Sequence, residues 1–514
     1  MKQTSTLLAR FLVRASMGLG LGLVAGAGAL AQTTTPTQPP AGTLSEAAST
    51  GSWTLQSAVD YALQNNLVVR QSVLTSDLNS ATLRQSKAAL LPTANLTGTQ
   101  AWNYGTNINP LTNIFQDQTT RTNNFSGSTQ VTLFAGFQLR NTIKRNTLEY
   151  EAGLNDVEKA RNDLALNVAS AFLQTVLAAE LVRTNQVRVN STQQQVNRTK
   201  VLLKAGSVAE SNLLDLQAQL ATDQFNVVTA QNQLDIARLQ LAQLMNLDAA
   251  GTRALTITTP SLPDPDEQSL TDVQPDETYQ VAQAALPEIK AADLRVRSAL
   301  RNVEVARGAY YPRLTFGANI FTGYSSLYTR PIVTGDSIQI PLPVFQYDAI
   351  TGQPLPTSFV ALSPKQPVRS SASSDFPNQI KNNLGRSLQF GLQIPILNGL
   401  QARTAVQRSQ IAVKQAELRL EQARLTLRQS IQQAYADALA AQRQYIASRQ
   451  QVEALTLSYR NSEIRFNNGL LNGTEFNIAK NNLTAAESNM IQAKYSFIFR
   501  RKVLDFYQGK PLTL

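Results

Sequence analysis

The residue types that most often carry chemistry are missing from this chain. Its 514 residues include no histidine and no cysteine. It therefore has no imidazole base, no Ser-His-Asp triad, no thiolate nucleophile, no disulfide and no metal site built from cysteine or histidine. No glycine-rich phosphate loop follows a predicted strand, and sequence spacing alone places no two carboxylates together. We expect no enzyme, no catalytic residue, no cofactor and no metal.

The positive charge of the chain does not indicate a nucleic-acid partner. Lys and Arg number 46 against 35 Asp and Glu, a formal net charge of +11. These cations are scattered along predicted helices, whereas nucleic-acid sites gather them on one face, often with aromatic residues. The run Arg500-Arg501-Lys502 is interpreted as a solvated face near a helix C-terminus.

The N-terminus predicts export. Three basic residues precede an apolar run from Met17 to Leu30 that closes on Ala-Leu-Ala. We interpret residues 1–31 as a signal peptide, because the run is shorter than the ~20 residues of a membrane-spanning anchor and a small-residue cleavage site follows. Residues 32–52, rich in Thr, Pro and Ala, are expected to form a flexible leader.

The remaining chain repeats itself. Leu91-Pro92 corresponds to Tyr311-Pro312 at an offset of 220 residues, and the segment around Gly136 corresponds to that around Gly399 at an offset of 263. The difference locates an insertion of 43 residues in the second half, in a stretch rich in proline. We predict two structural repeats, residues 53–250 and 278–514, joined by a linker at 251–277. Within the second repeat, residues 325–385 are predicted to be a loop insertion with at most a little strand, because proline forbids a long helix.

Each repeat should contain one very long helix. The spans from Gly136 to Gly206 and from Gly399 to Gly469 contain no proline, so nothing forces a break. At 1.5 Å per residue, 70 residues of helix extend about 105 Å. A shorter helix should return from each glycine turn, and another should precede each strand region; these two are expected to stack end to end beside the long helix. The predicted helices are 136–204, 210–246, 399–467 and 474–507, with shorter ones near 67–91 and 288–311.

Alternating residues predict strands between these helices. Residues 313–324 and 386–397 alternate apolar side chains with small or polar ones, and residues 93–104 and 125–134 do so more weakly. Segments of about ten residues with two such faces are typical of strands in membrane β-barrels. Two hairpins packed on a soluble core would show the same alternation. Four strands cannot close a barrel, so a membrane location requires an oligomer: eight strands from a dimer or twelve from a trimer.

The order of these elements resembles the TolC family of outer-membrane efflux channels. The likeness rests on Leu91-Pro92 and Tyr311-Pro312, on the strand-to-helix segments ending at Gly136 and Gly399, and on the later glycine turns. It implies a mainly α-helical fold with a membrane β-barrel: a homotrimer with a twelve-stranded barrel in the outer-membrane lipid and a twelve-helix tunnel in the periplasm. It also implies a passive conduit for tripartite efflux or type I secretion, with a periplasmic adaptor (membrane fusion) protein and an inner-membrane transporter as partners.

The same resemblance assigns roles to residues at the far end of the helices. It places the adaptor contact at two turns, and the constriction of the periplasmic entrance in the helices that follow them. The turns are Gly206, Ser207, Val208 and Gly469, Leu470, Leu471; the constriction residues are Glu475, Asn212 and Asp215. Three copies of Glu475 around an axis would repel one another and attract cations. Glu475 also stands where an acid stabilises the first turn of a helix, which is the simpler interpretation of that residue.

A second class of function remains open from the sequence. A secreted or periplasmic helical spacer, with its hairpins packed on a soluble cap, would have the same long helices. A tube should have an uncharged polar lining, whereas a solid coiled-coil rod should have one continuous apolar core with charged flanks. The Gln, Asn and Ser content of the helices favours the tube.

Overall fold

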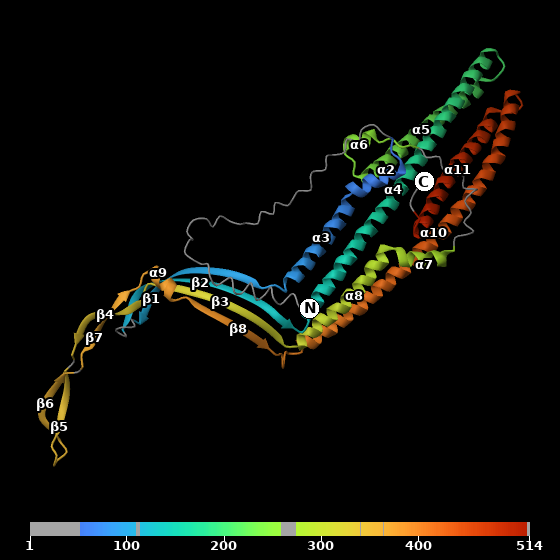
Figure 1. Ribbon diagram of the computed structural model, residues 1–514. Coiled ribbons are helices and arrows are strands. Elements are labelled where there is room, and N and C mark those ends of the chain that lie inside the picture. Colours follow the sequence, from blue (N-terminus) through green and yellow to red (C-terminus); the bar gives the residue numbers. More distant parts are fainter. Residues whose placement is uncertain (1–51, 109–113, 259–273, 340, 363, 511–514) are drawn as a thin grey trace.

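The computed structural model describes residues 52–108, 114–258, 274–339, 341–362 and 364–510. The predicted signal peptide and all of the leader except Ser52 lie outside these residues. Long helices form one end of the molecule and a curved sheet forms the other (Figure 1). Helices α2–α6 and strands β1–β2 belong to the first half of the chain, and the remaining elements to the second.

The helices of both halves have matching lengths. The first half contains α2 (Leu55–Asn65), α3 (Leu67–Ala88), α4 (Gln138–Lys204), α5 (Glu210–Met245) and α6 (Ala249–Ala254). The second half contains α7 (Pro275–Ala285), α8 (Pro287–Arg307), a 3-10 turn (Gly308–Tyr310), α9 (Phe376–Asn382), α10 (Gln401–Asn467) and α11 (Gly473–Tyr507). Both α4 and α10 have 67 residues, and the offset between them is 263 at both ends. The duplication in the sequence is therefore a duplication of the fold.

Both long helices begin two residues later than expected, for one physical reason. Gly136 and Phe137 have positive φ angles of 55° and 61°, and Gly399 and Leu400 repeat them at 57° and 64°. Two consecutive left-handed residues turn the chain sharply from strand to helix. The helix can therefore start only after the second residue of each pair.

Two short helices stack end to end against each long one. The last turn of α5 meets the first turn of α3, where the Asn66 side chain caps α3 through the Val68 N–H and donates to the Leu244 carbonyl, 2.9 Å away. An apolar cluster seals this junction with side chains of α2, α3, α4 and α5, among them Val69, Phe172 and Met245. Helices α7, α8 and α10 form a corresponding cluster in the second half.

Helices α2 and α7 were not predicted. Both are 11 residues long and lie beside these two clusters, at the middle of the helical end. Helix α7 begins inside the segment predicted as a linker, and Ile257 of that segment forms a bridge with Trp53. Residues 259–273 of the predicted linker lie outside the described residues.

Helix α4 contains one 18-residue stretch that is long and apolar enough to cross a membrane, with a mean hydropathy of 1.5. The stretch is not an uninterrupted apolar run, because polar residues such as Ser170, Gln174 and Thr175 lie within this part of the helix. Of this stretch, 44% is buried inside the chain. The buried side chains of α4, including Val168 and Phe172, pack in the cluster with α2 and α5. This is the environment of a core helix.

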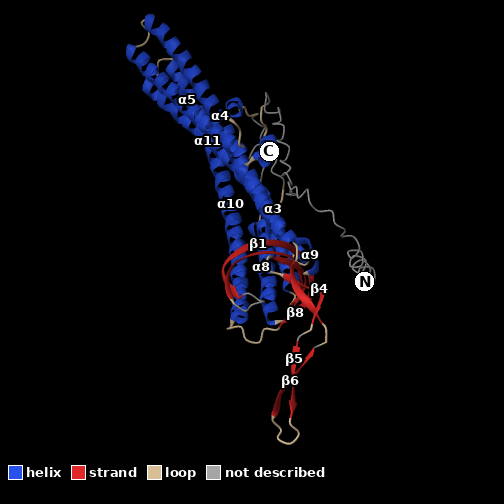
Figure 2. Ribbon diagram, turned by 90° about the vertical axis from the view of Figure 1, so that its left-hand side faces the viewer, coloured by secondary structure: helices blue, strands red, loops and turns tan. Residues whose placement is uncertain are grey.

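Four strands form one antiparallel sheet in the order β1-β2-β3-β8. They are β1 (Thr93–Ile108), β2 (Phe115–Ala135), β3 (Arg313–Ser325) and β8 (Gly385–Gln393). The pair Thr93 and Gln130 recurs as Arg313 and Gln393, so the two hairpins of the sheet have the same register. The sheet curves into an arc when it is viewed from the side (Figure 2).

Strands β1 and β2 are longer than predicted. Beyond the expected ends, at 104 and 125, the sequence is rich in Thr, Asn and Gln on both faces, so the apolar alternation stops. The pairing nevertheless continues as far as Ile108 and Phe115. Backbone hydrogen bonds extend the ladder where side-chain hydropathy gives no signal.

Residues 325–385 contain more regular structure than the predicted loop with a little strand. The segment contains two two-stranded ladders and a short helix: β4 (Thr329–Ile338) pairs with β7 (Gln366–Ser373), β5 (Pro341–Tyr347) pairs with β6 (Pro354–Leu362), and α9 follows. Proline excludes a long helix here, but it does not exclude a strand. Both strands of each ladder are edge strands, so a residue whose nitrogen faces away from the partner strand needs no N–H. We call the two ladders the appendage; it extends from the end of the sheet opposite the long helices (Figures 1 and 2).

Candidate functional site

One face of the sheet is polar, and Arg313 lies on it at the end nearest the helices. The register places Asn95, Ser128 and Asn319 side by side across three strands, and Gln130, Gly317 and Gln389 across the next three positions. These residues line a small groove on that face. The residues of this groove can hydrogen-bond water and none of them is charged, which suits the wall of an aqueous passage.

The other face is apolar. Leu96, Ile320, Phe316 and Phe390 lie on it, alternating with the polar residues along each strand. Its residues are exposed in the single chain: 87% for Leu96 and 69% for Phe390. A contiguous apolar surface of this kind must be covered, and lipid is the cover that period-two strands of this length fit.

The two outer strands of this sheet leave edges open. In the described part of the chain, β1 pairs only with β2, and β8 pairs only with β3. Unpaired backbone groups are costly in a hydrocarbon environment, so a sheet with this apolar face requires further strands at both edges.

At the far end of the helices, the two predicted turns have the same geometry. Gly206 and Gly469 have φ angles of 69° and 72°. The Ser207 N–H donates to the Leu202 carbonyl at 2.9 Å, and the Leu470 N–H donates to the Arg465 carbonyl at 2.8 Å. This is the Schellman arrangement, in which a glycine ends a helix. The turns form the tips of the two helical hairpins (Figure 1), and Val208 and Leu471 follow them.

The structure brings two of the three predicted constriction residues together. A Cβ built on Gly473, the first residue of α11, would lie 3.7 Å from both the Asn212 Oδ1 and the Asp215 Oδ2 atoms. These side chains of the first hairpin therefore face the N-terminus of α11, where a helix attracts negative charge. Glu475 is exposed in the first turn of the same helix, and its N–H donates to the Asn472 side chain at 2.7 Å.

An aromatic stack holds the second hairpin together near its tip. Phe476 of α11 is 1% exposed and stacks on Phe466 of α10, with ring centroids 4.6 Å apart. The corresponding pair in the first hairpin is Leu213 and Leu203. This stack was not predicted from the sequence, although two Phe residues ten positions apart across a glycine turn were the available signal.

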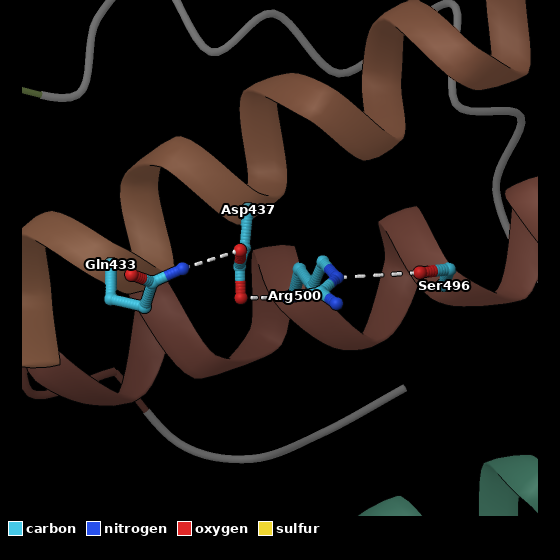
Figure 3. Close-up of polar contacts among 4 residues, drawn as sticks. All are labelled: Gln433, Asp437, Ser496 and Arg500. Atoms are coloured by element: carbon cyan, nitrogen blue, oxygen red, sulfur yellow. Dashed lines mark hydrogen bonds and ion pairs between the residues drawn. The ribbon is translucent and has the colours of Figure 1, made fainter.

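Charged side chains on the second hairpin are paired, which corrects the interpretation of Arg500 and Arg501 as a solvated face. Arg500 of α11 forms an ion pair with Asp437 of α10, and Gln433 donates to the same carboxylate at 2.8 Å (Figure 3). Arg501 pairs with Asp505 at 3.5 Å. The sequence missed the first of these pairs because its partners are 63 residues apart.

Comparison with known proteins identifies this architecture. The family described as outer membrane efflux protein matches residues 58–247 and 369–509. The matched segments include both hairpins and most of the sheet. The part left unmatched contains the linker, α8 and most of the appendage.

The relatives whose function is known share only about a quarter of their aligned residues with this chain. The pyoverdine export outer membrane protein OpmQ of Pseudomonas putida is 25% identical over 41% of this chain and 44% of its own length. The toxin and drug export protein A of Aggregatibacter actinomycetemcomitans is 26% identical over 56% of this chain and 63% of its own. The chain thus spans between about two fifths and two thirds of these relatives.

Solved structures show the same fold over most of the chain. The Campylobacter jejuni CmeC outer membrane channel superposes with a TM-score of 0.69 at 15% identity, covering 90% of this chain and 87% of that one. VceC of Vibrio cholerae gives a TM-score of 0.67 at 13% identity, covering 89% and 97%. With almost two thirds of its residues inside the family match and nearly all of its fold shared with these channels, the chain belongs to the outer membrane efflux protein family and is located in the outer membrane.

Proposed function

We propose that the protein is the outer-membrane channel of an efflux or type I secretion system, a passive conduit through which other proteins drive export. The observation that carries this proposal is the two-faced curved sheet, polar on one side and apolar on the other, joined without a break to helices of 67 residues. The sheet suits a pore wall in lipid, and the helices suit a tube that extends it into the periplasm.

The channel would be a homotrimer. Three copies supply twelve strands, and the β8 edge of each copy would pair with the β1 edge of the next. Exposed apolar side chains on the helices also support a ring of three copies. Ser298 of α8 is buried inside the chain, whereas the corresponding Leu78 of α3 is 68% exposed; Ile411, Leu418 and Leu425 of α10 are also exposed. These surfaces are those that the next copy would cover.

The tip would be the site of opening and docking. Its turns, Gly206-Ser207-Val208 and Gly469-Leu470-Leu471, would meet a periplasmic adaptor, which would in turn link the channel to an inner-membrane transporter. Asn212, Asp215 and Glu475 would line the constricted entrance. The named relatives are described as exporting pyoverdine, and toxins and drugs; a polar wall suits the passage of polar solutes.

Single-channel recording tests the proposal. Purified trimer in a planar lipid bilayer should give small, cation-preferring currents that divalent cations on the tip side reduce. Glu475→Gln should weaken both the preference and the block, because it removes three negative charges from the entrance. Glu453→Gln, an exposed acid about four turns before the C-terminal end of α10, is the control and should change neither.

Two other outcomes would change the assignment. Currents that are unchanged by Glu475→Gln would still support a channel. Glu475 would then only stabilise the first turn of its helix. An absence of current from protein shown to be trimeric, together with recovery in the soluble fraction without detergent, would favour a helical spacer instead.

A further inference from the structure

Three positively charged side chains lie around α9, at the end of the sheet farthest from the long helices (Figure 1). They are Arg121 of β2, Lys381 of α9 and Arg386 of β8, and all three are exposed. None of them has an ion-pair partner in the described part of the chain. A group of exposed cations without counter-charges of their own attracts anions.

Two of these cations share the apolar face of the sheet. Arg386 lies opposite Ile320, and Arg121 lies opposite Trp102, which is six residues beyond Leu96 on β1. Alternate residues of a strand share a face. Both cations therefore lie on the side of the sheet that lipid would cover.

Helix α9 places the third cation beside the same face. The Phe376 ring packs on Tyr324, with ring centroids 5.4 Å apart, and the Thr322 hydroxyl donates to the Ile380 carbonyl at 2.6 Å. Both of these β3 partners belong to the apolar face. Lys381 follows Ile380 directly, in the last turn of the helix. The three cations thus gather around one corner of the sheet, within a single chain.

The duplication of the fold sets the depth of this corner. Arg386 precedes Gly399 by 13 residues, and Asn123 precedes Gly136 by the same number. Because the two hairpins of the sheet have the same register, Arg386 and Asn123 lie equally far from the helical end. Arg121 is two residues beyond Asn123 on the same face, about 7 Å farther along the strand.

The apolar band of the sheet ends at this depth. From Leu314 to Tyr324, β3 extends about 34 Å, which at the tilt of barrel strands is a height of about 24–28 Å and matches the ~25 Å apolar band of outer-membrane barrels. A polar pair follows on the same face, where Asn123 donates to Gln100 at 3.2 Å. Next to this pair Trp102 is 54% exposed, and tryptophan favours the boundary between lipid chains and water.

The position of the corner favours a lipid over a soluble anion. With the helical end in the periplasm, this depth faces the outer leaflet of the outer membrane. Lys and Arg side chains at a membrane surface attract anionic lipid head groups, and both bind phosphate. The apolar face directly beneath them would hold the acyl chains of the same lipid.

We propose that Arg121, Lys381 and Arg386 bind the phosphate groups of anionic lipids in the outer leaflet, with the acyl chains on the apolar face beneath. The inference rests on the outer-membrane location and on contacts within one chain. Whether the protein conducts solutes does not enter it.

Lipid binding by the purified protein tests this site. Native mass spectrometry in neutral detergent compares dioleoylphosphatidylglycerol, which is anionic, with dioleoylphosphatidylcholine, which has the same chains and no net charge. The parent should bind the anionic lipid at least fivefold more tightly. The triple variant Arg121→Gln, Lys381→Gln, Arg386→Gln should bind both lipids equally within twofold. Arg460→Gln, at an exposed position of α10, is the control and should keep the preference of the parent.

Phosphatidylcholine binding should be the same in the parent and the triple variant, because the apolar face is unchanged. Equal binding of the two lipids by the parent, or a preference that survives in the triple variant, would overturn the site. So would an equal loss of both lipids in that variant, because charge would then not be the cause. Glycerol phosphate, which is the head group without chains, should not displace the anionic lipid at tenfold excess; displacement would assign the cations to a soluble anion instead.

Trp102 measures the depth independently. The chain contains two tryptophans, so Trp53→Phe leaves Trp102 as the only one. In lipid vesicles, a nitroxide on the head group should quench its fluorescence at least twice as strongly as a nitroxide at the centre of the acyl chain. Stronger quenching by the chain label would place this corner among the lipid chains and overturn the site, because exposed cations are destabilising at that depth.

Discussion

At the scale of single residues, backbone conformation matters more in this protein than reactive chemistry. The strand-to-helix turns use left-handed residues in pairs, and the second residue of each pair is Phe137 or Leu400. A left-handed conformation costs a residue with a side chain roughly 1–2 kcal/mol. Phe137 is held there by edge-to-face contact with Phe134, at 5.4 Å between ring centroids. The turn between barrel strand and tunnel helix is thus stabilised by its own neighbours.

Two matched glycine substitutions test how these turns pack. A Cβ at Gly136 would lie 2.4 Å from the Gly308 carbonyl oxygen, whereas a Cβ at Gly399 has no atom within 4 Å in the single chain. Gly399→Ala should therefore lower the free energy of unfolding by only about 1–2 kcal/mol, from its positive φ. Gly136→Ala should lower the free energy of unfolding by at least twice as much, because the backbone at Gly308 must move. Urea unfolding followed by helical circular dichroism measures both, and equal losses would contradict the close packing at Gly136.

A pH dependence is expected from Glu487 of α11. Burial raises the pKa of its carboxyl above the value of about 4.5 for an exposed glutamate, and the Arg188 guanidinium opposes the rise. Because the folded pKa is the higher one, this group adds stability below the unfolded pKa, and the gain is lost as the pH rises through the folded pKa. The stability of the Glu487→Gln variant relative to the parent should thus be higher at pH 7 than at pH 4.5. Thermal unfolding at both values measures the difference; Glu453→Gln, at an exposed site, is the control.

At the scale of elements, the internal symmetry predicts how strands of neighbouring copies pair. Thr129 and Ala318 lie opposite each other in the ladder. Adding 263 to the first number gives Leu392, and subtracting 220 from the second gives Gly98. Strand β8 of one copy should therefore meet β1 of the next with these two residues opposite each other. The same symmetry relates the two hairpins already seen within the copy.

Engineered disulfides check this register. Leu392→Cys with Gly98→Cys should give covalent trimers on oxidation, since directly opposite Cβ atoms in an antiparallel pair lie within disulfide reach. Leu392→Cys with Thr99→Cys shifts the register by one residue, places the thiols on opposite faces and should give no more than a tenth of that yield. Equal yields from the two pairs would contradict the predicted register.

At the scale of the whole molecule, the appendage is separable from the channel. Its junction with the sheet is held locally: the Gln379 amide accepts from the Ser325 N–H at 2.9 Å and donates to the Ser325 carbonyl at 3.0 Å, and Phe376 packs on Tyr324. Thr329 and Ser373 are paired at the base of the ladders. The chain can therefore be rejoined there without moving the sheet.

Deletion of residues 330–372, with Thr329 joined to Ser373 through two glycines, should leave trimer assembly and single-channel conductance within twofold of the parent. The reason is that α9 and its contacts with β3 are retained. Native gel electrophoresis and bilayer recording measure the two properties. Loss of the trimer would show that the appendage takes part in assembly, and a several-fold rise in conductance would show that it narrows the passage.

The sequence by itself determined the repeated architecture, because the signals are local or periodic. Proline-free spans predicted the two long helices to within two residues, glycine marked the turns at their tips, and alternation identified the two faces of β3 and β8. Only the tertiary structure decided which distant residues meet. The contact of Lys480 with Thr192 spans 288 residues, and the ladders of the appendage depend on pairing that its prolines concealed. Periodicity in the sequence indicates which face of an element is buried, but it does not indicate which other element packs against that face. Whether a charged side chain is buried depends on that other element.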